Sequence, residues 1–225
     1  MKLQLATAVL VLLATAGLLA AADHRAEPLA EPAPADGYSP EILAELEQAG
    51  LKVIRGKSRT LSDIWLCKAW AAAADFSPSS TVIYPFEPGQ LIGVVRYKTK
   101  GGDFRGQQIP PGLYVLRYSQ QPVDGNHVGT SDTRDFLILT PADEDKAVEP
   151  IEQKALFKLS AKVAGTTHPV MLSLKRTATE PAEAGSLRHD EEADLWILQA
   201  AGKTAAQETP SELRLDIVVA GEAVH

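Results

Sequence analysis

Residues 122–135 form the densest polar stretch of the sequence, and their side chains include the types that metal binding and nucleophilic catalysis both need. We expect one strand to end near Ser119 and the next to start at Phe136, which makes this a long connection. Long connections in compact domains are usually either functional or mobile. The candidate binding residues of this loop are Asp124, Asn126, His127, Ser131, Asp132, Arg134 and Asp135.

Calcium binding is the first chemistry that the spacing suggests. Calcium loops place oxygen ligands around a tight glycine turn over twelve residues. Two features depart from this pattern, since position 5 is Val128 and position 12 is an aspartate instead of the longer glutamate. The expected flanking elements are strands, whereas an EF-hand has helices. Positions 1, 3, 6, 9 and 12 of the pattern fall on Asp124, Asn126, Gly129, Asp132 and Asp135.

Nucleophilic hydrolysis is the second chemistry. Ser131 supplies a hydroxyl, His127 a base, and Asp124 or Asp135 an orienting carboxylate. Catalytic triads are assembled by the fold from distant segments, however, and Ser131 lies in no nucleophile-elbow sequence.

A structural role is the interpretation that we favour for the loop. Short polar side chains cap backbone N–H groups in loops, and Gly125 and Gly129 can adopt positive φ. Arg134 is placed to pair with Asp132 or Asp135. This hypothesis also accommodates His127 as a hydrogen-bonded loop histidine.

Other functional signatures are missing from the sequence. It contains no Cys-x-x-Cys, no His-Glu-x-x-His and no glycine-rich phosphate loop, and we predict no cofactor and no metal. A transition-metal site would need His127 to meet His168, His189 or Cys67. Cys67 is the only cysteine, and its apolar neighbours predict a buried, inert thiol. Three tryptophans could stack on a sugar but are more typical of a core: Trp65, Trp70 and Trp196.

The elements that position these residues are mainly strands. In residues 213–219 every second residue is apolar, the pattern of a half-buried strand. Eight further runs are rich in β-branched or aromatic residues and are bounded by turn residues. These runs are 52–56, 61–68, 80–85, 90–98, 112–119, 134–140, 169–176 and 194–199.

Two short helices interrupt the strand pattern. The first is predicted over 40–49, with Ser39 as its cap and Pro40 in its first position. The second is predicted over 151–163, where apolar residues share one helical face and Gly165 supplies a stop signal. The fold class is therefore mostly β: an antiparallel β-sandwich or distorted barrel of about nine strands with two short peripheral helices.

The N-terminal residues predict export. Lys2 precedes an apolar run over 5–19 and three alanines at 20–22, the three parts of a cleavable signal peptide. Its apolar run is short for a membrane anchor, which needs about 20 residues. We predict a signal peptide over 1–22, a flexible linker over 23–37 and a single domain over 38–225, in the periplasm or secreted. A net charge of −7 disfavours nucleic acid as a partner, and no later segment predicts a membrane span.

Four stretches carry a resemblance to known proteins: Pro111–Tyr114, Asp124–Ser131 with Asp135-Phe136, Gly165–Pro169 and Asp194–Ile197. Together they resemble a family of exported bacterial β-sandwich proteins that is known only as a domain of unknown function. The likeness covers about residues 51–220. It implies an exported β-sandwich and no established catalytic residues.

The sequence thus favours an exported, non-enzymatic binding or structural module that takes an unknown envelope or extracellular ligand. The alternatives are a hydrolase that uses the 124–135 loop, or a calcium-binding module.

Overall fold

The computed structural model describes residues 23–123, 131–177, 183–205 and 210–223. The chain is mostly β within these ranges, with two helices, one of them short. The helices are α1 (Pro40–Glu45) and α2 (Gln153–Ala164). The first seven strands are β1 (His24–Leu29), β2 (Gly50–Arg55), β3 (Arg59–Leu66), β4 (Trp70–Ala71), β5 (Leu91–Tyr97), β6 (Gly101–Gly102) and β7 (Gln108–Ile109). The others are β8 (Gly112–Gln120), β9 (Asp135–Pro141), β10 (Met171–Lys175), β11 (Ser186–Asp190), β12 (Leu195–Ala205) and β13 (Glu212–Ala220).

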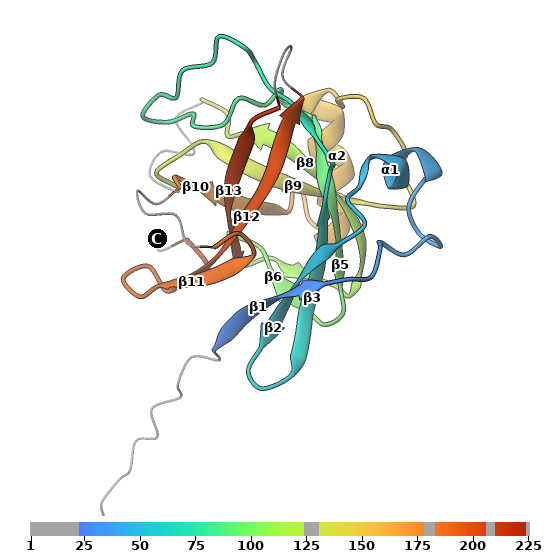
Figure 1. The fold of residues 1–225 in the computed structure, drawn as a ribbon, viewed down its shortest axis with the longest axis vertical. Coiled ribbons are helices and arrows are strands. Elements are labelled where there is room, and N and C mark those ends of the chain that lie inside the picture. The colour runs from blue at the N-terminus through green and yellow to red at the C-terminus, as the bar shows by residue number, and fades with distance from the viewer. Residues whose placement is uncertain (1–22, 124–130, 178–182, 206–209, 224–225) are drawn as a thin grey trace, which may run out of the picture.

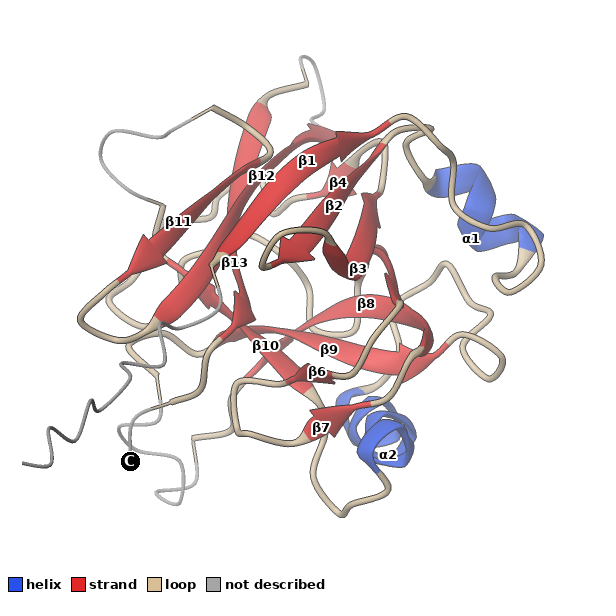
Figure 2. Ribbon diagram, turned by 90° about the horizontal axis from the view of Figure 1, so that it is seen from below, coloured by secondary structure: helices blue, strands red, loops and turns tan. Residues whose placement is uncertain are grey.

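One strongly curled sheet of eleven strands forms the body of the protein, a half-barrel (Figure 1). Its path runs β1-β2-β3-β5-β8-β9-β10-β13-β12-β11 with antiparallel neighbours, and β4 joins β12 in parallel. The end strands β1 and β11 contact each other. A separate small sheet pairs β6 with β7, and both helices lie at the periphery (Figure 2). The distorted barrel, one of the two predicted architectures, is therefore the one that the structure has.

Residues 24–29 correct the prediction of a flexible linker over 23–37. They form β1, which pairs with β2 from His24 opposite Arg55 to Leu29 opposite Gly50. Leu29 is buried, as is Ala33 beyond the strand. The segment carries no apolar periodicity of its own, and its order comes from the free edge of β2.

A predicted strand and a predicted helix end are also wrong, because contacts with distant residues determine the structure at both places. Residues 80–85 form no strand, because Ile83 and Tyr84 donate their backbone N–H groups to the carboxylate of Asp135. The first helix ends at Glu45 instead of residue 49, since Leu46 turns extended and forms a β-bridge with Cys67. Its predicted cap is confirmed: the Ser39 hydroxyl accepts a hydrogen bond from the N–H of Ile42 at 3.3 Å.

Apolar side chains pack on both faces of several strands. On β9, Leu137 and Leu139 belong to the main core, whereas Phe136 and Ile138 face the other way. The main core draws residues from β2 round to β13, as expected for the inside of a curled sheet. The opposite face carries the second apolar cluster: Phe104, Phe136, Ile138, Leu156, Leu195, Ile197 and Val218.

A buried ion pair fixes the chain that leads into α2. Arg117 on β8 is fully buried and donates to both carboxylate oxygens of Asp145, each at 2.7 Å. Its remaining N–H groups reach the carbonyl oxygens of Gly89, Ala147 and Glu149. All five guanidinium donors are thus used, which holds residues 145–149 against the sheet.

Candidate functional site

Helix α2 packs beside the second apolar cluster, as the predicted helix over 151–163 required. The Glu152 carboxylate caps it by accepting from the N–H of Ala155 at 3.1 Å, and Gly165 ends it in the left-handed conformation with φ 65°. Gln153 ties the first turn to β8 through the hydroxyl of Ser119 and the carbonyl of Gln120. Leu156 and Val163 are its buried apolar anchors.

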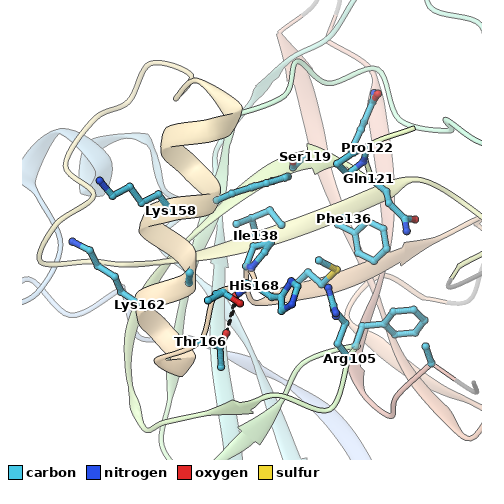
Figure 3. Close-up of a pocket in the computed structure, with 18 of the residues that line it drawn as sticks. Arg105, Ser119, Gln121, Pro122, Phe136, Ile138, Lys158, Lys162, Thr166 and His168 are labelled. Atoms are coloured by element: carbon cyan, nitrogen blue, oxygen red, sulfur yellow. Dashed lines mark hydrogen bonds between the residues drawn. The ribbon is translucent and has the colours of Figure 1, made fainter. Parts of the chain in front are cut away.

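A cleft of about 1220 Å³ opens between α2 and the sheet (Figure 3). Phe136 and Ile138 of β9 line it together with Met171 of β10, and Phe157 projects from the helix. The β6–β7 turn contributes Phe104. The lining is thus apolar in the middle and is built by elements far apart in the sequence. A concave apolar site of this kind is typical of small-molecule binding.

Asp103 holds the β6–β7 turn in place beside the cleft. Its buried carboxylate accepts from the N–H groups of Arg105 and Gln107, at 2.9 and 2.8 Å, and from the N–H of Met171 at 3.2 Å. Phe104 N–H also donates to the carbonyl of Met171 at 2.9 Å. One carboxylate therefore fixes both Phe104 and Arg105 relative to β10.

The connection from α2 to β10 forms the end of the cleft. Thr166 accepts from the N–H of His168 at 3.2 Å, and its hydroxyl lies 2.6 Å from Oε1 of Gln107. Buried Ser160 hydrogen-bonds both backbone groups of Val170. His168 is exposed, and in Figure 3 its ring points into the cleft.

Among the described residues that line the cleft, the charged side chains are all cationic and none is Asp or Glu. Arg105 also points into the cleft, whereas Lys158 and Lys162 aim their ammonium groups away from it, past the helix (Figure 3). Lys162 is paired with Glu144. Of the labelled cationic or titratable side chains, Arg105 and His168 are therefore the ones that point into the cleft.

In the structure, the four described residues of the predicted loop site contact four different groups and do not converge. Ser131 lies with its hydroxyl 3.2 Å from that of Ser173. Exposed Asp132 approaches the Lys175 ammonium at 3.4 Å, and Arg134 donates from Nε to the carbonyl of Gln121 at 2.8 Å. Asp135 points inward. The other predicted loop residues, Asp124, Asn126 and His127, lie outside the described residues.

Asp135 has a structural role. Its carboxylate accepts from the Tyr118 hydroxyl at 2.5 Å as well as from the N–H groups of Ile83 and Tyr84. Burial raises the pKa of Asp135, and the hydrogen bonds it accepts act in the opposite direction. The carboxylate joins segment 81–86 to β8 and β9.

The described residues hold no group of three or more side chains suited to a metal. Cys67 is a buried free thiol as predicted, and burial raises its pKa to about 12. Trp65 and Trp70 belong to the main core. Trp196 is half-buried and stacks on His189 at 4.2 Å between ring centroids, so the three tryptophans form no common platform.

Comparison with family models, curated proteins and solved structures yields no match. The resemblance to an exported β-sandwich family therefore stays a prediction. Among the described residues no helix has both the length and the apolar character to cross a bilayer.

The cleft was missed by the sequence analysis, because its residues come from separate elements that only the fold brings together. One local signal was present. The run Gly101-Gly102-Asp103-Phe104-Arg105-Gly106 is a turn sequence that carries an exposed cation beside an aromatic residue.

Proposed function

We propose that this protein is a binding module that holds a largely apolar small molecule in the cleft between α2 and the sheet. The cleft itself carries this proposal, since it combines a volume of about 1220 Å³ with apolar side chains from several elements and polar side chains beside them. Ligand sites in proteins are typically concave, mostly apolar and largely preformed.

The positioning of the walls supports binding by a preformed site. Gln153 anchors the first turn of α2 to β8, Ser160 in the second half of the helix bonds Val170 just before β10, and Asp103 anchors the β6–β7 turn. A ligand entering such a site loses little affinity to ordering of the protein. Within the part of the lining that the structure describes, no nucleophile, base and acid come together, and binding is the activity that we assign.

Export belongs to the same proposal and rests on residues 1–22, whose three-part pattern predicts a signal peptide. The ligand is then one met outside the cytoplasm.

Filling the cleft from the helix side tests the binding proposal. Ala161 on α2 lines the cleft, whereas Ala155 on the same helix is exposed and does not line it. We expect the neutral fluorescent probe N-phenyl-1-naphthylamine to bind the protein with enhanced emission. Ala161→Trp should weaken that binding at least about tenfold by occluding the site, and the matched change Ala155→Trp should leave it unaltered. Equal probe binding by both variants would contradict a site in the cleft.

A further inference from the structure

We infer that the cleft selects an anionic amphiphile, a hydrocarbon chain ending in a carboxylate, with the chain over Phe136, Ile138 and Phe157 and the head group at Arg105 and His168. This inference rests on the proposed function and adds the chemical class of the ligand.

The distribution of polar groups separates a head region from a tail region. Arg105 and His168 come from two different connections, the β6–β7 turn and the α2–β10 segment, and both point into the cleft (Figure 3). Neither side chain forms a hydrogen bond or an ion pair with another described residue, whereas Lys162 forms an ion pair with Glu144. A guanidinium group can bind a carboxylate through two parallel N–H···O hydrogen bonds. These charge-assisted bonds are stronger than hydrogen bonds between neutral groups.

The backbone below these side chains fixes where the head group would lie. Arg105 N–H is held by Asp103, and His168 N–H is held by Thr166, whose hydroxyl also meets Gln107. Gln107 in turn donates to Asp103 and to the carbonyl of Pro169. One hydrogen-bonded network therefore joins the two connections and sets Arg105 and His168 at one end of the apolar lining.

The net charge of the chain and the charges of the described cleft lining have opposite signs. The whole chain carries a net charge of −7, so its long-range field favours cations over anions. The described residues that line the cleft reverse this balance, since they include cations and no Asp or Glu. A preference for an anionic head group must therefore arise at the site itself.

Three ligands with the same twelve-carbon chain provide the test: dodecanoate, dodecanol and dodecyltrimethylammonium, measured by displacement of the neutral probe from the full protein, all below their micelle concentrations. We expect dodecanoate to bind at least about fivefold more tightly than dodecanol, as for a charge-assisted hydrogen bond at a partly exposed site. Shortening the carboxylate to decanoate should weaken binding by up to about fourfold for each methylene removed.

A matched pair of variants locates the head group. Arg105→Gln should abolish the preference of dodecanoate over dodecanol, whereas Lys158→Gln should preserve it, because Lys158 lines the cleft with its stem and points its charge away. Near-ultraviolet circular dichroism checks that both variants keep the native packing.

The outcomes separate this inference from the proposed function. Probe binding that is blocked by Ala161→Trp but shows equal affinity for dodecanoate and dodecanol would retain the binding site and overturn the anionic head group. Equal loss of the preference in Arg105→Gln and Lys158→Gln would also overturn it. Failure of the probe and of all three amphiphiles to bind would overturn both proposals.

Discussion

At the scale of single residues, buried charged groups in this protein hold segments together. The Arg117–Asp145 pair joins segment 145–149 to the sheet, and Asp135 joins segment 81–86 to it. The sequence analysis identified Asp135 as a candidate ligand. A polar segment alone does not show whether one of its carboxylates faces solvent or the interior. Burial alone distinguishes the two, and burial depends on Tyr118, which lies on a different strand from Asp135.

The buried Arg117–Asp145 pair predicts that two equivalent carboxylate-to-amide substitutions will have very different effects on the free energy of unfolding. Asp145→Asn removes the charge that compensates fully buried Arg117 and should lower the free energy of unfolding by about 3–5 kcal/mol. Glu27→Gln makes the same change in the exposed pair with Arg25 and should cost at most about 1 kcal/mol. Urea denaturation of both variants measures the difference. Similar losses in the two variants would show that Arg117 does not depend on Asp145.

At the scale of elements, the sequence pattern correctly predicted an element when the residues that determine its structure lie within that element. Helix α2 was predicted well because its cap, its apolar face and Gly165 all lie within its own sequence. The strand at 80–85 and the linker at 23–37 were wrong for the opposite reason. Ile83 and Tyr84 find a side-chain carboxylate where a strand partner was expected, and β1 has a partner where none was expected.

Two carboxylates in these elements predict opposite pH dependences. Glu152 caps α2, and hydrogen bonds from the N–H groups of Lys154 and Ala155 lower its pKa below the ordinary 4.5. Its contribution to stability is present above pH 4.5 and is lost as the pH falls through the lowered pKa. Asp216 on β13 is buried, and this raises its pKa above 3.8 despite the nearby charge of Arg188. Its contribution is present below pH 3.8 and is lost as the pH rises through the raised pKa.

The measurement is urea unfolding of the wild type, Glu152→Gln and Asp216→Asn over a pH series. The wild-type free energy of unfolding minus that of Glu152→Gln should increase with pH, and the corresponding difference for Asp216→Asn should decrease. Differences that change in the same direction would contradict these assignments.

At the scale of the whole molecule, the cleft exists because the curled sheet has two apolar faces and its outer face is only partly covered. The inner face fills the half-barrel, and the outer face needs α2, the β6–β7 turn and the segment after β13 to cover it. Ala223 in that last segment donates its N–H to the carbonyl of Phe104 at 2.9 Å. The cover is partial, and the cleft is the part of the outer face between these three elements.

Sequence analysis could predict the mostly β class and the two helices, but it could not predict the cleft. Phe104, Phe136 and Phe157 each have a satisfactory explanation as core residues of their own segment. Their convergence depends on β6–β7, β9 and α2 meeting on one face, which follows from strand order and not from any local signal.

A crystal structure of the protein with dodecanoate brominated at its terminal carbon tests the central claim most directly. Anomalous scattering locates the bromine without reference to the protein coordinates. The account predicts a bromine peak in the cleft near Phe136, Ile138 and Phe157, with the carboxylate at Arg105. A peak at any other surface, or ligand density with the carboxylate remote from Arg105 and the bromine outside the cleft, would contradict it.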